Sequence, residues 1–339
     1  MADSLQRHLE QFKNFPHEAK PHLNVESICD YGWLVKPKRT AVALPAGKTL
    51  GLTLMGLTHG NELAGAAVIN EVLAHLGAGN LALDIPVAII LGNPWAAKEN
   101  RRFLERDLNR SFGRDAAKLK EEIRAKELSP ILETTACLLD LHQTTRPSDR
   151  PFFIFGYNER NYEFARAISP RLTIVTHWGK PFSSEGRCTD EYVISKGGTG
   201  ISLELGQNGF DPYQIAVGVE ACLWAIRVAT AELSGESIAH RAATATPDLY
   251  TWAETMNWPV KGYVELHEGL NNFAPVNAGD SLGRCDGEPI RAGASGRILF
   301  PKYLSRADQD KLTSRPTELC RVMKAISPAD LPTIKHPVS

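Results

Sequence analysis

The sequence lacks the features that mark exported, membrane-spanning and nucleic-acid-binding chains. Lys and Arg number 38 against 39 Asp and Glu, so the formal net charge of -1 gives no global attraction for nucleic acid or an anionic membrane. The first 15 residues carry regular charges and lack the continuous apolar stretch of a secretory signal. The longest apolar runs, such as residues 86–92, are far shorter than the roughly 20 residues that span a bilayer. We therefore expect a soluble, cytoplasmic protein that acts on a small molecule.

Paired cysteines, internal repeats and low-complexity segments are also absent. The six cysteines stand singly, with none of the C-x-x-C spacings that zinc ribbons and redox motifs use. Hydrophobic residues make up 43% and charged residues 23% of the chain, which is close to the average for a globular enzyme. A chain of 339 residues is long enough to bury one large core and a smaller appended one.

Short β-branched runs alternate with longer helical patterns from residue 50 onward, which is typical of an α/β fold with helices packed on a sheet. The runs that we expect to form strands are 40–46, 50–57, 86–92, 136–142, 151–157, 172–177 and 200–205. They are nearly all apolar, as strands covered on both faces should be. Residues 63–77, 114–128 and 211–233 have the spacing of helices.

A stretch of small and polar residues, 234–248, separates the last expected helix from a region of different texture. Short alternating runs punctuated by glycines follow between residues 249 and 305, which indicates a small antiparallel β unit. We therefore expect two domains, an α/β domain over residues 1–240 and a β-rich domain over residues 241–339.

A predicted strand leads directly into His59, Gly60, Asn61 and Glu62, at the position where an open α/β sheet places functional groups. His59 and Glu62 are three residues apart, so both side chains can reach one point from a helical turn. A catalytic zinc ion takes three ligands of His or carboxylate type and keeps a fourth position for water. His142 ends a second predicted strand and supplies the third ligand if the two strands are parallel. We predict one zinc ion per chain at this site.

Asp140 lies two residues before His142 and can orient an imidazole. Residues 93–110 are dense in fixed donors, and Asn109 with Arg110 can clamp a carboxylate. A solvated charged loop is the alternative interpretation of that segment.

Glu204 lies inside an otherwise apolar run, where an unpaired carboxylate is costly to bury. The carboxylate of Glu204 therefore needs a charged partner or a functional role. An ion pair with a nearby arginine is one interpretation, and a general base beside a metal-bound water is the other.

The order of these motifs resembles that of the succinylglutamate desuccinylase and aspartoacylase family, a branch of the zinc carboxypeptidase fold. Residues 59–62 and 140–142 are similar to the family's two metal motifs, residues 93–110 to its anion-binding segment, and residues 204–206 to its catalytic glutamate. The resemblance implies a mixed, mostly parallel sheet with helices on both sides. It also implies that the second, β-rich domain partly covers the active site of the first, catalytic domain.

The resemblance further implies roles for individual residues. Arg102 falls where the family places the arginine that polarises the scissile carbonyl group. Asn109 and Arg110 fall where the family binds a substrate carboxylate. Tyr303 is the candidate for a substrate-binding tyrosine in the second domain.

The chain departs from the aspartoacylase pattern at one position. Aspartoacylases carry a further substrate-binding arginine shortly before the catalytic glutamate, where this sequence holds Ile194 and Lys196. The sequence therefore leaves the acyl group of the substrate open. Histidines outside the motifs, such as His177, are most simply interpreted as surface or hydrogen-bonded residues.

These features predict a zinc-dependent amide hydrolase that deacylates a small N-acyl amino acid or a related carboxylated amide, with Glu204 taking the proton of a zinc-bound water. A metallocarboxypeptidase is the alternative, because Asn109 and Arg110 would serve the terminal carboxylate of a peptide equally well. A non-catalytic zinc- or ligand-binding protein is a second alternative, although loss of Glu204 or Arg102 would have been its signature. The number of subunits stays open, a homo-oligomer included.

Overall fold

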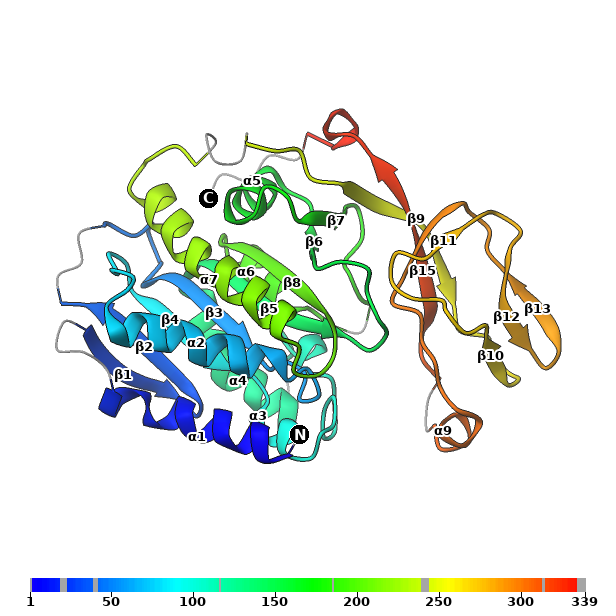
Figure 1. The fold of residues 1–339 in the computed structure, drawn as a ribbon, viewed down its shortest axis with the longest axis horizontal. Helices are drawn as coiled ribbons and strands as arrows, with labels where there is room; N and C mark the ends of the chain where they lie inside the picture. The colour runs from blue at the N-terminus through cyan, green and yellow to red at the C-terminus, as the bar shows by residue number, and fades with distance from the viewer. Residues whose placement is uncertain are drawn as a thin grey trace.

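The computed structural model of the chain (Figure 1) describes residues 2–18, 23–38, 42–115, 117–184, 186–238, 244–312 and 315–333. Over these segments a mixed sheet of 12 strands forms the framework of the fold, and three further strands form a smaller sheet. The central strands of the larger sheet are mostly parallel, whereas both of its flanks are antiparallel. The predicted α/β class, with a mixed sheet between helices and a smaller β-rich part, is confirmed.

Four parallel neighbours lie at the centre of the larger sheet. They are β4 (Val87–Leu91), β3 (Leu50–Gly56), β5 (Thr135–Thr144) and β8 (Thr199–Gln207). All residues of β3, β4 and β5 are buried, as expected for strands covered by helices on both faces. Because these strands are parallel, their carboxyl ends meet at one edge of the sheet.

Helices cover the two faces of this sheet with separate hydrophobic cores. The first face carries α1 (Ala2–Glu18), α2 (Ala64–Ala78), α5 (Glu159–Ile168) and α7 (Pro212–Leu233). The second face carries α4 (Lys120–Glu133) and α6 (Thr189–Ser195). Two short helices in the connection from β4 to α4 are α3 (Pro94–Lys98) and η1 (Leu108–Arg110).

The long helix α7 is confirmed where the sequence predicted it. The side chain of Asp211 accepts a hydrogen bond from the backbone N–H of Gln214 at 2.9 Å and caps its first turn. By length and composition alone, α7 is apolar enough to cross a membrane. It instead packs along α2 and α5 and over β3, β5 and β8, which is the position of a core helix.

Two of the sequence predictions for the first half of the chain need correction. Residues 42–46 of the strand expected at 40–46 lie in a loop, because Pro45 begins a tight turn in which Gly47 has a φ of +74°; residues 40 and 41 lie outside the described part. The helix expected at 114–128 begins only at residue 120, where the Glu122 carboxylate accepts from the backbone N–H groups of the two residues before it, 118 and 119. The elements that were not predicted include β1 (Leu23–Cys29), β2 (Gly32–Pro37) and the helices α1, α3 and α5.

The larger sheet continues into the C-terminal region. Beyond β8 its strands are, in order, β6 (Phe152–Gly156), β7 (Thr173–His177), β9 (Leu249–Asn257), β15 (Glu318–Ile326), β14 (Gly296–Leu299) and β11 (Pro275–Val276). The smaller sheet consists of β10 (Val264–Leu266), β12 (Ser281–Cys285) and β13 (Glu288–Arg291). Two short helices, α9 (Arg306–Asp310) and η2 (Pro328–Asp330), complete this region.

The predicted domain boundary between residues 240 and 241 lies outside the described residues. β9 follows that gap and pairs in parallel with β7, so the sheet itself does not stop there. Figure 1 shows β9 and β15 running from the main body toward the smaller sheet. These two long antiparallel strands connect the C-terminal region to the rest of the fold.

Candidate active site

The first predicted metal motif occupies the tight connection from β3 to α2. His59 and Glu62 are both buried, and the backbone N–H of Glu62 donates to the carbonyl of His59 at 3.1 Å, which turns the chain between them. Gly60 is required by packing, because a Cβ atom there would lie 2.3 Å from the backbone nitrogen of Ala97. The short turn therefore directs both side chains to the same side.

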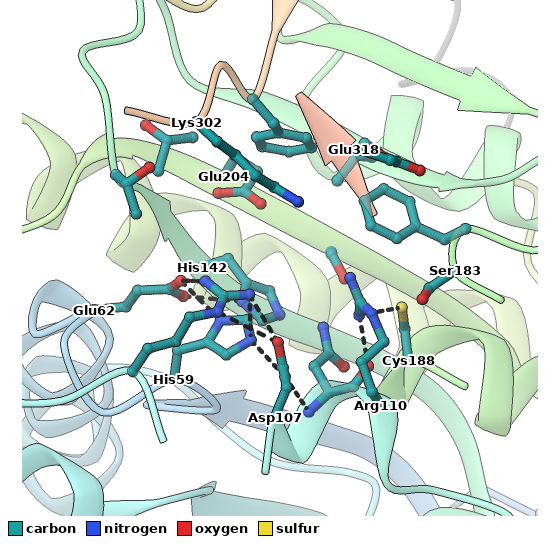
Figure 2. A pocket seen from close by; sticks show the side chains of 18 of the residues that line it. His59, Glu62, Asp107, Arg110, His142, Ser183, Cys188, Glu204, Lys302 and Glu318 are labelled. Atoms are coloured by element: carbon teal, nitrogen blue, oxygen red, sulfur yellow. Dashed lines mark hydrogen bonds and ion pairs between the residues drawn. The ribbon is translucent and has the colours of Figure 1, made fainter. Parts of the chain in front are cut away.

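The three predicted metal ligands meet at the carboxyl ends of β3 and β5. The Glu62 carboxylate lies between the two imidazoles, with Oε1 2.7 Å from Nδ1 of His59 and Oε2 3.0 Å from Nδ1 of His142. One ligand atom from each side chain lies within 4.8 Å of the others, and Figure 2 shows all three converging. Two nitrogens and one carboxylate oxygen at this spacing fit a divalent metal ion, with the fourth position left for water.

The outer nitrogen of each imidazole contacts a second carboxylate. Nε2 of His59 lies 3.0 Å from Oδ1 of Asp107, and Nε2 of His142 lies 2.9 Å from Oδ2 of Asp140. This arrangement turns both Nδ1 atoms toward Glu62, where a metal ion could bind. The predicted contact between Asp140 and an imidazole is present, and Asp140 also accepts from the hydroxyl of Thr189 at 2.6 Å.

Charge stabilises this buried cluster. Burial opposes ionisation of Glu62, but the neighbouring His59 and His142 hold the pKa of that carboxyl well below its usual range. Burial likewise opposes protonation of His142, but Asp140 and Glu62 raise the pKa of its imidazole well above the usual value. The cluster therefore keeps Glu62 ionised, as metal binding requires, whereas the imidazole of His142 would release its proton on binding a metal ion.

Glu204 lies in β8 directly beside His142 of β5, because the two residues are partners in the parallel register. Its side chain lines the cleft, and Figure 2 shows it across the cleft from His59 and Glu62. Its Oε2 atom is buried and has no hydrogen-bond partner in the described part of the chain. Burial raises the pKa of the Glu204 carboxyl to about 7. The alternative interpretation was an ion pair between Glu204 and an arginine. No such pair is formed among the described residues, and Arg102 pairs with Glu62 and Asp107 instead, which favours the interpretation of Glu204 as a proton acceptor.

The segment from β4 to α4 brings Arg102, Asn109 and Arg110 to the same cleft. Nη1 of Arg102 lies 3.3 Å from Oε1 of Glu62 and Nη2 lies 3.1 Å from Oδ2 of Asp107, which places its guanidinium beside the predicted metal ligands. The side-chain oxygen of Asn109 accepts from the backbone N–H of Thr189 at 2.9 Å. Arg110 donates to the backbone oxygen of Asn109 at 2.6 Å, so the two predicted carboxylate-binding residues are adjacent.

The cleft has a volume of about 410 Å³ and two walls. The first wall contains the groups described above. The second, C-terminal wall is formed by Phe300, Lys302, Tyr303, Leu304, Pro316, Thr317, Glu318 and Arg321. A volume of this size suits a small molecule.

Tyr303, predicted to bind substrate, lies in the C-terminal wall with its hydroxyl turned to the backbone. That hydroxyl donates to the carbonyl of His267 and accepts from the N–H of Leu270 at 3.1 Å. Lys196 pairs with Glu133 at 2.9 Å and does not belong to the cleft lining described here. Lys196 therefore does not take the role of the substrate-binding arginine that aspartoacylases carry shortly before the catalytic glutamate.

Several cleft residues were not predicted from the sequence. Asp107 lies inside the 93–110 segment that the sequence analysis described. Its contact with His59 depends on the path of a loop, which the sequence does not predict. Cys188 and Phe182 come from the connection between β7 and α6, and Arg321 comes from β15. Arg321 interrupts an apolar run, which is the same signal that had singled out Glu204.

Comparisons with known proteins agree with this geometry. Residues 48–222, just over half of the chain, match the model of the succinylglutamate desuccinylase/aspartoacylase catalytic domain. A succinylglutamate desuccinylase of Serratia proteamaculans is 27% identical over 281 residues, covering 78% of this chain and 80% of that protein. An N-acyl-aromatic-L-amino acid amidohydrolase (carboxylate-forming) of Danio rerio is 38% identical over 109 residues, covering 28% of this chain and 35% of that protein.

A solved structure similar to this fold is that of a succinylglutamate desuccinylase from Vibrio parahaemolyticus. It superposes with a TM-score of 0.68 at 15% identity and covers 91% of this chain and 90% of that chain. At this identity the likeness concerns the fold.

Proposed function

Since this chain belongs to the succinylglutamate desuccinylase/aspartoacylase family, as its motifs predicted, we propose that it is a metal-dependent deacylase of small N-acyl amino acids. The observation that carries the proposal is the position of Glu204. Its carboxylate lies beside His142, lines the cleft, and keeps one oxygen without a partner among the residues described. A buried carboxylate next to three metal-binding side chains is the arrangement that metal-assisted hydrolysis of an amide needs.

We assign His59, Glu62 and His142 as the ligands of one zinc ion per chain. Two imidazole nitrogens and one carboxylate oxygen are a donor set of catalytic zinc sites. When bound, the ion would lower the pKa of a coordinated water and polarise the carbonyl group of the substrate. Asp107 and Asp140 would keep the two imidazoles oriented by accepting from their Nε2 nitrogens.

Glu204 would serve as the general base and then as the general acid. It would accept a proton from water as the oxygen bonds to the amide carbon, and return that proton to the nitrogen as the carbon–nitrogen bond breaks. The products would be a carboxylate and a free amine. Arg102, beside the metal ligands, would donate to the carbonyl oxygen while negative charge develops on it.

Asn109 and Arg110 would hold the carboxylate of the amino acid. Anchoring the substrate away from the reacting bond would orient the amide toward Glu204 and Arg102. Tyr303 would contribute the face of its ring to the wall, since its hydroxyl already bonds to the backbone of residues 267 and 270.

The C-terminal wall favours a small substrate over the alternative, a peptide cleaved at its C-terminus. Side chains from β15 and from the segment before α9 line the side of the cleft that faces the proposed metal ligands. An extended peptide would need an open path there. Lys302 and Glu318 face the cleft from this wall in Figure 2.

The test is release of free amine from a panel of N-acetyl and N-succinyl amino acids, compared with dipeptides that have a free C-terminus. We expect turnover of N-acyl amino acids by the wild type and its loss in Glu204→Gln. Glu220→Gln is a matched control, because Glu220 is an exposed residue of α7 outside this cleft. Cleavage of dipeptides in preference to every N-acyl amino acid would contradict the proposal and favour a carboxypeptidase.

A further inference from the structure

Arg321 of β15 is a buried cation in the C-terminal wall of the cleft. It is 2% exposed, and its guanidinium carbon lies 3.7 Å from the ring centroid of Trp252 and 4.4 Å from that of Phe182. Two rings thus hold the plane of the guanidinium group. Since Arg321 also lines the cleft, the side chain is fixed at the edge of the substrate space.

Hydrogen bonds occupy part of this guanidinium. Nε and Nη2 donate to the Glu318 carboxylate at 2.9 and 2.7 Å, and Nη2 also donates to the backbone oxygen of Phe182 at 2.8 Å. Nη1 is buried and has no acceptor within the described segments. A buried donor without an acceptor is unfavourable, so an acceptor supplied by a ligand would relieve that cost.

Phe182 connects Arg321 to the proposed carboxylate site. The guanidinium carbon of Arg110 lies 5.0 Å from the centroid of the same ring that Arg321 contacts. Two arginines thus border one aromatic side chain inside one cleft. Lys302, from the same wall as Arg321, extends into the cleft in Figure 2 and adds positive charge there.

Building on the proposed function, we propose that Arg321 binds a second carboxylate of the substrate while Arg110 binds the first. Glu318 and the two rings orient the guanidinium, and Nη1 donates to the incoming carboxylate oxygen. Arg321 thereby selects substrates with two carboxylates.

The test measures binding without turnover, by calorimetry on the metal-loaded protein. The ligand pairs are L-glutamate with L-glutamine and succinate with succinamate, which differ by one carboxylate replaced by a carboxamide. The first pair probes the amino acid side and the second probes the acyl side. We expect the wild type to bind the dicarboxylate of at least one pair roughly 10- to 100-fold more tightly than the corresponding carboxamide. The reason is that the second carboxylate forms a charge-assisted hydrogen bond.

Arg321→Met should abolish that preference and leave the affinity for the carboxamide partner unchanged. Arg321→Lys should restore part of it, and Arg297→Met is the matched control on β14, next to β15. Absence of a preference in the wild type, or equal loss for both members of a pair in Arg321→Met, would overturn the inference. An Arg321-dependent preference in a protein that releases no amine would support the inference and count against the proposed function alone.

Discussion

The two walls of the cleft are built differently. The wall at the ends of β3, β5 and β8 is buried and internally bonded, and His59, Glu62 and His142 are each no more than 3% exposed. The C-terminal wall comes from β15 and the segment before α9, and its Lys302 and Tyr303 are partly exposed. In the proposed function, the groups for chemistry all lie in the first wall, whereas selection is shared between Arg110 of the first wall and Arg321 of the second. Changes to the proposed metal ligands, Glu204 or Arg102 should therefore lower kcat, whereas changes to Arg110 or to the second wall should raise KM.

Replacing one glutamate in each wall should give the largest difference in kinetic effect. Glu204→Gln should lower kcat by roughly 100- to 10,000-fold, because it removes the proposed proton acceptor. Glu318→Gln should leave kcat nearly unchanged and raise KM, because it alters only the orientation of Arg321. Steady-state kinetics with the best N-acyl amino acid measures both. Equal losses of kcat in the two variants would remove the distinction between the walls.

A pair of arginines should give the next contrast. Arg102→Met should lower kcat by roughly 100- to 1,000-fold, the usual effect of removing one donor to a developing oxyanion. Arg110→Met should act mainly on KM, because Arg110 would hold the carboxylate away from the reacting bond. Both variants need a metal analysis, since Arg102 lies 3.3 Å from Glu62. A normal kcat in metal-loaded Arg102→Met would exclude its proposed role.

Replacing His177, which lies behind the C-terminal wall, should change the pH dependence of stability and should not change catalysis. Burial lowers the pKa of His177 to about 4, and its ring stacks on Trp252 at 4.1 Å. The unfolded chain takes up this proton near pH 6.5, so below that pH the unfolded state binds more protons and the free energy of unfolding falls. The loss between pH 7 and pH 5 should be about 2 kcal/mol.

His177→Phe keeps a ring against Trp252 and removes the titration. Urea unfolding at pH 5, 6 and 7 should therefore show a flatter pH dependence than in the wild type. An unchanged slope would show that His177 is not the group that titrates in this range.

Tyr303→Phe should give the smallest effect. The hydroxyl of Tyr303 bonds to the backbone of His267 and Leu270, so its removal should cost about 1 kcal/mol of stability. The ring face stays in the cleft, so kcat and KM should stay within about twofold of the wild type. A large rise in KM in this variant would assign the hydroxyl to the substrate.

The first wall could be predicted from the sequence because short-range features specify it. His59 and Glu62 lie in one turn after an apolar strand, and His142 and Glu204 lie near the ends of two other apolar strands. Parallel strands bring such ends to one edge, so no detailed register was needed. The loop from β4 to α4 was harder, and Asp107 was placed only by the structure.

The second wall could not be predicted because long-range pairing specifies it. β15 pairs with β9, which lies more than 60 residues earlier in the chain, and this pairing brings Arg321 beside Trp252. Phe182 reaches Arg321 from the connection between β7 and α6. The short alternating runs after residue 248 indicated antiparallel strands. They did not indicate that four of these strands would extend the larger sheet.

The most direct test of the central claim is a metal titration of the purified protein. The protein is stripped with a chelator and zinc is restored stepwise, while metal content and amine release from an N-acyl amino acid are measured. We predict that turnover returns in proportion to zinc up to one ion per chain, and that His142→Ala neither retains the metal nor recovers activity. Full turnover by the stripped protein, or by His142→Ala without metal, would contradict the account.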